Sequence, residues 1–385
     1  MANVTSPASP ASSAGVPRKR VRLRAELLLL LISCLMCFLA LEIYVRLTWA
    51  GQWYLPAKYM RDDTVFSYMF KPNLDIPFTN ADGVTSRIIT NERGFRGPTM
   101  AQIADKPFRI VSIGDSFAQG SGINANEHAM TRFAENYAKA HPERGVALAN
   151  VSCGGWSPDD YLFAYLTEVL PTGCELVVLS IFPRNDILPQ GYRRTTTPSR
   201  DGPEFLTPSI WSNLKPKFFQ WAKARIYGSA LFNRVAIQMG IALTAFDRFN
   251  PDMEYQRKEW DTTFFYLDAI VKAVREHGSE IVILSYPTSM QVNTGRAIDE
   301  ASFDSHMPEK MLAEFCRTHS VPFISPLDTL VAKNAKQDLY FPTDHHLSAK
   351  GHDVLLGVLE EQLTPIVDAQ SEKRSKPPAA APAAK

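Results

Sequence analysis

Short apolar runs alternate with longer amphipathic segments through the middle of the chain. The apolar runs are residues 108–113, 146–151, 176–182, 280–285 and 321–324. Their length and their content of valine, isoleucine and leucine are typical of buried β-strands. The amphipathic segments predict helices at residues 127–140, 158–170, 256–277, 308–319 and 348–363. This alternation predicts a three-layer α/β/α fold, in which helices cover both faces of a mostly parallel sheet.

A continuous apolar segment lies near the N-terminus, at residues 27–45. At about 1.5 Å per residue, a helix over this segment would be roughly 28 Å long, close to the thickness of the bilayer's hydrocarbon core. The basic residues directly before it are Arg18, Lys19, Arg20, Arg22 and Arg24. Positive charges flanking a membrane helix favour the cytoplasmic side. We therefore expect a single-pass anchor at 25–47 in the plasma (inner) membrane, with the N-terminus cytoplasmic and the main domain periplasmic or extracellular.

A cleaved signal peptide is the alternative interpretation of this segment. The apolar part of a signal peptide is usually only about 7–15 residues long. Here the run is longer, and it leads into Glu42 and Arg46 rather than into small residues suited to cleavage. These features favour an anchor over a signal peptide.

Changes of composition divide the rest of the chain. The predicted parts are a basic cytoplasmic tail at 1–24, a stalk packing on the main domain at 48–106, the main domain at 107–368, and a disordered tail rich in alanine and proline at 369–385. Residues 187–251 interrupt the strand–helix alternation and form an insertion. Because it follows the third strand at the sheet edge where α/β proteins bind ligands, the insertion is either a lid or a passive addition.

Composition narrows the class of protein. Hydrophobic residues make up 45% of the chain, which is enough for a packed core, and the formal net charge is only +1. A balanced charge and the lack of a recognition motif give no indication of nucleic-acid binding. The spacing of the cysteines indicates no metal site, and a disulfide between Cys153 and Cys174 stays open.

The first candidate for chemistry is Ser116, in the sequence Ile-Gly-Asp-Ser-Phe-Ala-Gln-Gly that directly follows the strand at 108–113. A strand that ends in a turn beside glycine can present a serine hydroxyl at the edge of a sheet. A hydroxyl is a weak nucleophile at neutral pH, so it needs a base. Asp115, although it neighbours the serine, is expected to be a structural hydrogen-bonding residue.

The second candidate is the sequence Asp-His-His-Leu-Ser, which contains Asp344, His345 and His346. Histidine is suited to general-base catalysis near neutral pH, and a carboxylate can orient its ring. Two alternatives are a metal site built on the same residues and a structural cluster at the start of a helix, with Ser348 as its N-cap. The combination with Ser116 favours catalysis.

Two further blocks lie between these candidates: Asn-Val-Ser-Cys-Gly-Gly-Trp at 150–156 and Phe-Pro-Arg-Asn-Asp at 182–186. With Gly-Asp-Ser at 114–116 and Asp-His-His-Leu at 344–347, these four blocks in order resemble the SGNH (GDSL-like) hydrolase superfamily in its membrane-anchored bacterial form, over about residues 107–365. The resemblance implies that Ser116 is the nucleophile, and that Asp344 and His346 complete a catalytic triad. It also implies that the backbone N–H groups of Ser116 and Gly155, together with the side-chain amide of Asn185, bind the oxyanion. No cofactor and no metal are implied.

Two positions depart from the family pattern. Pro183 stands where the third block usually has glycine, which puts the geometry of the Asn185 loop in doubt. The last block is often Asp-x-x-His, whereas one residue separates Asp344 from His346 here. His346 is preferred over His345 as the base because Leu-Ser-x-x-Gly follows it, as it follows the histidine of the family.

The expected activity is that of a serine esterase that cleaves an acyl ester of an envelope glycan or lipid. The same residues would also serve a polysaccharide O-acyltransferase, and a non-catalytic glycan-binding envelope protein is a third hypothesis. Protein partners cannot be predicted. A further run at 90–97, Thr-Asn-Glu-Arg-Gly-Phe-Arg-Gly, resembles a segment of anchored relatives. Its arginines, Arg93 and Arg96, either bind a substrate or help this segment to pack.

Overall fold

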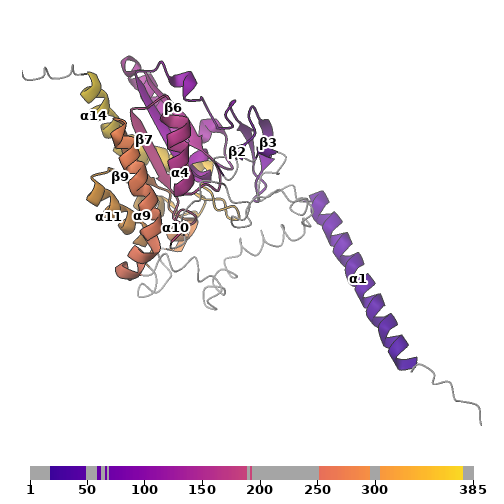
Figure 1. Cartoon of the computed structure of the whole chain (residues 1–385). Coiled ribbons are helices and arrows are strands. Elements are labelled where there is room, and N and C mark those ends of the chain that lie inside the picture. Colours follow the sequence, from indigo (N-terminus) through magenta and orange to yellow (C-terminus); the bar gives the residue numbers. More distant parts are fainter. Residues whose placement is uncertain are drawn as a thin grey trace, which may run out of the picture.

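A five-stranded parallel sheet forms the centre of the molecule (Figure 1). The computed structural model describes residues 18–48, 59–61, 66, 69–188, 191–192, 251–294 and 304–375. The order of strands is β6-β5-β7-β8-β9. Their bounds are β5 (Phe108–Gly114), β6 (Val146–Ser152), β7 (Leu176–Ile181), β8 (Glu280–Ser285) and β9 (Phe323–Ile324). The parallel sheet predicted from the apolar runs is confirmed.

The last strand is shorter than its apolar run. The run at 321–324 predicts a strand of that length, but β9 begins only at Phe323. Pro322 has no N–H to donate to a strand ladder, and its carbonyl alone accepts a hydrogen bond, from the Ile283 N–H at 3.0 Å. β9 lies at the edge of the sheet, where such a short pairing is tolerated.

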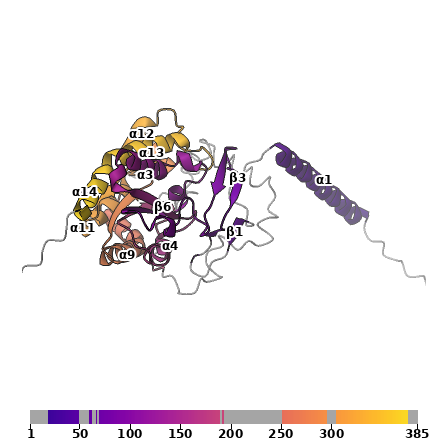
Figure 2. The same cartoon turned by 90° about the horizontal axis from the view of Figure 1, so that it is seen from above.

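Helices cover both faces of the sheet, as the alternation predicted. One face carries α4 (Pro158–Ala164), its π-helical continuation η5 (Tyr165–Val169), α9 (Met253–Glu276) and α11 (Met307–His319). The other face carries α3 (Ala129–Ala140), α12 (Leu327–Lys333) and α13 (Ala349–Gln362). Seen from above, α3, α12 and α13 lie on one side, with α4 and α9 on the other (Figure 2). Alternate strand residues point to opposite faces, so each helical layer has its own hydrophobic core.

The residues before β5 join the core on the α4 side. They form β1 (Met60–Arg61), β2 (Met69–Phe70), the hairpin β3 (Asp75–Thr79) and β4 (Thr85–Ile89), and the 3₁₀ turn η2 (Ala101–Ile103). Phe66, Met69 and Phe95 are buried in the same cluster as the sheet residues. The ring of Phe66 stacks on that of Trp156, with 4.4 Å between centroids. This segment therefore packs on the core of the main domain through apolar contacts.

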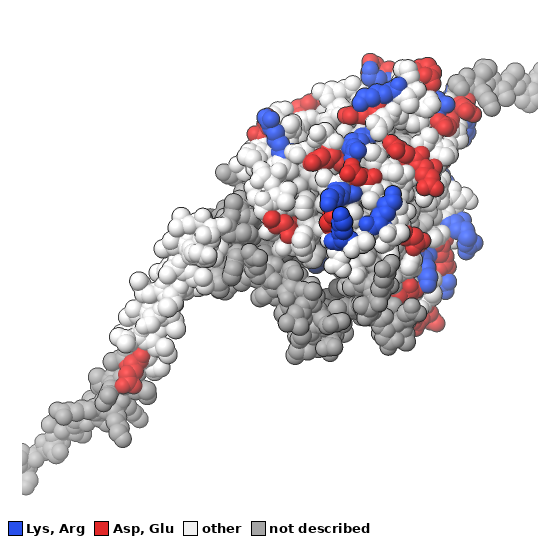
Figure 3. Space-filling model, turned by 180° about the vertical axis from the view of Figure 1, so that it is seen from behind, with Lys and Arg blue, Asp and Glu red and all other residues white. Residues whose placement is uncertain are grey.

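Helix α1 (Arg18–Thr48) contains one stretch, Glu26–Val45, that is long and apolar enough to cross a membrane, with a mean hydropathy of 2.5. A signal sequence near the N-terminus can also meet this criterion of length and composition. Most of its leucines are exposed, and the helix is almost free of charged side chains where the space-filling view describes it (Figure 3). The domain surface in the same view instead mixes positive and negative side chains.

The structure describes the predicted insertion only in part, and it extends the main domain at its C-terminus. The insertion predicted at 187–251 lies outside the described residues except for its two ends. At the C-terminus, α14 (Thr364–Ser375) continues past residue 369, where a disordered tail was predicted. Val367 is buried, and the Arg374 guanidinium donates to Glu175 Oε1 at 3.0 Å and to the Gly278 carbonyl at 2.9 Å. The helix, held by these contacts, thus extends into the range in which a disordered tail was predicted.

Candidate active site

Ser116 is the first residue of the short helix α2 (Ser116–Gln119), which begins where β5 ends. Asp115 caps this helix, because its Oδ1 accepts the Phe117 N–H at 2.9 Å. A side chain at Gly114 would put its Cβ 2.7 Å from Ala118 Cβ and 2.8 Å from Ser180 Cβ. Glycine therefore allows the turn to pack tightly against β7. Ser116 is thereby placed at the carboxyl edge of the sheet, with Asp115 as a structural residue.

The loop at residues 341–346, called the histidine loop below, brings His346 to this serine from the far end of the sequence. His346 Nε2 lies 2.7 Å from Ser116 Oγ, which is hydrogen-bond distance. On the other side of the ring, Nδ1 lies 3.2 Å from Asp344 Oδ1. This contact is longer and less well aligned than the one to Ser116, but it still raises the pKa of His346. The structure thus places Ser116, His346 and Asp344 in one continuous chain of polar contacts.

The backbone of His345 accommodates the short spacing between Asp344 and His346. His345 has a φ of 63°, in the left-handed region that is uncommon outside glycine and in which asparagine, aspartate and histidine are enriched. The loop closes around it, because the His345 N–H donates to the Phe341 carbonyl and the Phe341 N–H donates to the His346 carbonyl, both at 2.9 Å. His345 Nδ1 lies 3.1 Å from Ser289 Oγ. The His345 ring therefore contacts Ser289, while His346 contacts Ser116.

The two neighbouring histidines differ in pKa. Burial lowers the pKa of His346, but the Asp344 carboxylate more than compensates, and the pKa is raised above its ordinary value. Asp115 contributes in the same direction, and the Arg184 cation opposes it. Burial and Arg184 lower the pKa of His345 to about 4. The Asp344 carboxylate thus favours the charged form of His346, whereas burial and Arg184 favour the neutral form of His345.

The predicted oxyanion donors Gly155 and Asn185 lie on the loops that follow β6 and β7, the two strands beside β5. An ideal Cβ on Gly154 would lie 3.4 Å from Ser116 Cβ, so the Gly154–Gly155 turn passes beside the nucleophile. Gly155 adopts a φ of 81°, which glycine allows without strain. The Asn185 Nδ2 donates to the Trp156 carbonyl at 3.3 Å. The Asn185 side chain also hydrogen-bonds the Asp115 carboxylate.

The loop that carries Asn185 does not require the glycine that the family usually has. Pro183 is not among the described residues with a positive φ, so its fixed φ near −65° fits the turn. The N–H groups of Asn185 and Asp186 both donate to the Phe182 carbonyl, at 3.2 and 3.1 Å. Asp186 closes the loop in return, because its Oδ2 accepts the Phe182 N–H at 2.7 Å. The loop thus accommodates Pro183 and is closed by the Asp186 side chain.

The arginines of the 90–97 segment have structural contacts. The Arg96 side chain is buried, and its guanidinium donates to the carbonyls of Gly120 at 2.6 Å and Ile123 at 3.0 Å. Burial lowers the pKa of Arg96 to about 10. Arg93 pairs with Glu168. Of the two interpretations of this segment, packing therefore fits the contacts, because Arg96 fixes the loop after the nucleophile.

Two further residues near the site were not identified from the sequence. Asn150 Nδ2, from β6, donates to the Ala118 carbonyl at 2.7 Å and so holds α2 in place. Asp82, in the turn of the β3–β4 hairpin, accepts backbone N–H groups of the histidine loop. The turn sequence Asn-Ala-Asp-Gly predicts a tight turn, but nothing in it indicates which distant loop the turn contacts.

The disulfide between Cys153 and Cys174 that stayed open from the sequence is not formed in the structure. All five cysteines, which lie in the described part of the chain, are free thiols, and burial raises the pKa of Cys174 to about 11. Among the described residues, no group of three or more His, Cys, Asp and Glu side chains is arranged to hold a metal ion.

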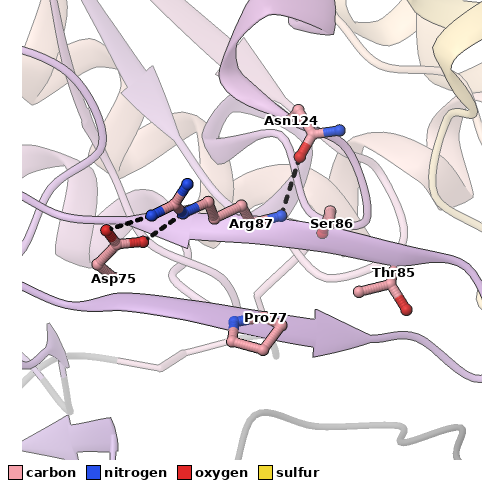
Figure 4. Close-up of a pocket in the computed structure, with 6 residues that line it drawn as sticks. All are labelled: Asp75, Pro77, Thr85, Ser86, Arg87 and Asn124. Atoms are coloured by element: carbon pink, nitrogen blue, oxygen red, sulfur yellow. Dashed lines mark hydrogen bonds and ion pairs between the residues drawn. The ribbon is translucent and has the colours of Figure 1, made fainter.

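Two shallow hollows lie near the hairpin. One of about 380 Å³ is lined by Asp75, Pro77, Thr85, Ser86, Arg87 and Asn124 (Figure 4). The other, of about 410 Å³, lies between the hairpin and the loop before α13. Neither hollow is lined by Ser116 or His346.

The fold and the site together define a class of protein, and the sequence comparison agrees with it. The profile of the GDSL-like Lipase/Acylhydrolase family matches residues 112–354, and the chain belongs to this family. It is an SGNH-type serine hydrolase, a carboxylic ester hydrolase. No curated protein matches the chain in sequence.

Solved structures of other proteins are similar to this chain at low sequence identity and low TM-score. A variant of the acetyl-xylooligosaccharide esterase Axe2 from Geobacillus has a TM-score of 0.40 and 10% identity, covering 67% of this chain and 94% of its own. A lipolytic G-D-S-L family protein from Veillonella parvula has a TM-score of 0.39 and 10% identity, covering 67% and 98%. The psychrotrophic esterase EstA from a Pseudoalteromonas species has a TM-score of 0.39 and 10% identity, covering 68% and 98%.

Proposed function

We propose that this chain is a membrane-anchored esterase that cleaves an acyl ester through Ser116, His346 and Asp344. The observation that carries the proposal is the 2.7 Å contact between His346 Nε2 and Ser116 Oγ at the carboxyl edge of the sheet. A nucleophile within hydrogen-bond distance of a base that a third group orients is the arrangement needed for acyl transfer to serine.

Each residue has a defined role in this reaction. His346 Nε2 removes the proton of Ser116 as Oγ attacks the acyl carbon of the ester. The oxyanion that forms accepts hydrogen bonds from the N–H groups of Ser116 and Gly155 and from Asn185 Nδ2. The imidazolium then gives its proton to the leaving alcohol, and a covalent acyl-Ser116 remains. Water, activated by the same His346, releases the acid and restores the serine.

The role of Asp344 leads to a prediction about pH. His346 can act as a base only when it is neutral, and Asp344 raises its pKa above the ordinary value of 6.5. We therefore expect turnover to fall as the pH decreases through a value above 6.5. Replacing Asp344 by asparagine removes the stabilising charge, so this acid limb should move to lower pH, and kcat should fall about 10⁴-fold. The pH dependence of kcat, measured with a short acyl ester, checks both effects.

A matched control for this prediction is Asp338→Asn. Asp338 lies near the same loop, but its carboxylate pairs with Lys350 at the surface. This variant should keep both the acid limb and kcat of the wild type. An acid limb that stays in place in Asp344→Asn would show that another group sets the pKa of the base.

We further propose that α1 anchors the esterase in the plasma (inner) membrane, with its N-terminus in the cytoplasm and the domain on the opposite side. The apolar stretch Glu26–Val45 and the basic residues before it support this topology. The test is extraction of membranes with alkaline carbonate, followed by N-terminal sequencing of the protein. An intact chain in the membrane pellet fits an anchor, whereas a chain cut after residue 45 in the soluble fraction is a secreted protein.

A domain anchored on the non-cytoplasmic side of the membrane, as proposed above, lies among the glycans and lipids of the envelope. This location supports an acylated glycan or lipid as the substrate. Hydrolysis and O-acyl transfer use the same residues, since they differ only in whether water or a sugar hydroxyl reaches the acyl-enzyme. The experiment is turnover of acetyl, butyryl and longer acyl esters, with and without an added oligosaccharide. Release of free acid alone supports an esterase, and appearance of acylated oligosaccharide supports a transferase. A folded protein that turns over no ester at all contradicts both.

A further inference from the structure

The turn of the β3–β4 hairpin lies against the loop that carries Asp344 and His346. The hairpin belongs to the segment before the family match, which begins at residue 112. Asp82, in the turn, accepts the Thr343 N–H at its Oδ1 over 2.9 Å and the Asp344 N–H at its Oδ2 over 2.8 Å. Each carboxylate oxygen thus binds one of two consecutive backbone N–H groups. Hydrogen bonds to an ionised acceptor are stronger than those between neutral groups, so this contact fixes the loop directly before His346.

Asn80, two residues earlier, holds both the turn and the candidate acid. Its side chain is completely buried, and its Oδ1 accepts the N–H groups of Asp82 at 3.1 Å and Val84 at 3.0 Å. This is an Asx-turn, in which the asparagine side chain hydrogen-bonds the backbone that follows it, and it fixes the direction of the Asp82 side chain. The Asn80 Nδ2 lies 3.5 Å from Asp344 Oδ2. One oxygen of Asp344 therefore faces His346, and the other faces the hairpin.

The hairpin is also attached to the loop on the serine side. The Arg87 N–H, on β4, donates to Asn124 Oδ1 at 2.9 Å (Figure 4). Asn124 follows the nucleophile helix and the loop at Gly120 and Ile123, whose carbonyls accept hydrogen bonds from Arg96. One small structural unit outside the central sheet thus contacts both the loop that follows α2 and the loop that carries Asp344 and His346.

We propose that Asp82 is a positioning residue for the reaction, which holds Asp344 in place beside His346. This inference rests on the proposed function. Without the Asp82 carboxylate, two backbone N–H groups lose their acceptors and the loop is free to turn. Asp344 would then move away from its 3.2 Å contact with His346 Nδ1. The charged groups that act on the His346 ring are Asp344, Asp115 and Arg184. Moving Asp344 away therefore leaves the cation of Arg184 less opposed.

The test compares Asp82→Ala and Asp82→Asn with Asp75→Asn, using the full chain in mild detergent and a short acyl ester. Asp75 lies on the same hairpin, but its carboxylate is exposed and pairs with Arg87 (Figure 4). In Asp82→Ala we expect kcat to fall about 10- to 100-fold, because misplacing a catalytic group by about 1 Å has effects of this size. KM should change little, and the acid limb should move to lower pH. Asp82→Glu, which keeps two acceptors, should recover part of kcat.

The melting temperature of each variant separates positioning from a general loss of structure. Asp82→Asn keeps one acceptor oxygen, so it serves as the test if Asp82→Ala does not fold. It should show a smaller loss of kcat, with the acid limb shifted in the same direction. The proposal is overturned if the folded Asp82 variants have the kcat and the acid limb of Asp75→Asn. A loss of activity that follows only the unfolded fraction, with an unchanged acid limb, overturns it as well. If the wild type itself shows no turnover that depends on Ser116, the proposed function fails, and the inference fails with it.

Discussion

Replacing Ser116 by alanine is expected to lower kcat for ester hydrolysis about 10⁶-fold, which is the scale on which removal of a nucleophilic serine acts in serine hydrolases. The physical reason is that no other group is available to form the acyl-enzyme, whereas the oxyanion donors and the substrate contacts remain. The fold should be unaffected, because Ser116 contributes only its hydroxyl to the contact with His346. Steady-state turnover of a chromogenic short-chain ester, with the melting temperature measured in parallel, checks this expectation.

Ser121→Ala is the matched control for this variant. Ser121 lies just after helix α2, which begins with Ser116, and its hydroxyl contacts Gln119 Oε1 at 3.4 Å rather than the histidine. Its turnover should equal that of the wild type. If Ser116→Ala keeps most of the wild-type turnover, Ser116 is not the nucleophile.

Replacing His346 by glutamine should have an effect of similar size, about 10⁶-fold in kcat, because serine and base act as a unit. Glutamine can still accept a hydrogen bond from Ser116, but it cannot take up the proton during attack. The comparison with His345→Asn identifies the base directly. Asparagine tolerates the left-handed backbone that position 345 adopts, at a φ of 63°, so this control should fold without added strain.

One outcome of this pair of variants would contradict the assignment of His346 as the base. We expect His345→Asn to keep turnover close to that of the wild type, since the His345 ring contacts Ser289 rather than Ser116. If His345→Asn is inactive and His346→Gln is active, the two histidines have the opposite roles.

The regular part of the fold was accessible from the sequence because buried parallel strands are written as nearly continuous apolar runs. β5 and β8 begin at the residue predicted from the pattern, and helix α13 follows Ser348, which is its N-cap as expected. Pro322 shortened β9 through its missing N–H, a local effect that the apolar pattern alone does not represent.

The irregular parts of the site were less accessible, since they depend on contacts between distant loops. Nothing in the sequence indicates that Asp82 binds the backbone before His346, or that Asp186 closes the loop around Pro183. The left-handed backbone of His345 is likewise set by the hydrogen bonds that close its loop. The arginine at position 96 illustrates the same limit, because its conspicuous charge is directed at buried carbonyls rather than at the surface.

The central claim is that Ser116 is a nucleophile activated by His346, and covalent labelling tests it most directly. The full chain in mild detergent is treated with a fluorophosphonate probe, and the modified residue is identified by peptide mass spectrometry. Our account predicts one adduct, on Ser116, that forms in the wild type and in Ser121→Ala and is strongly slowed in His346→Gln. An adduct on a different serine, or a folded wild-type protein that takes up no probe, would contradict the account.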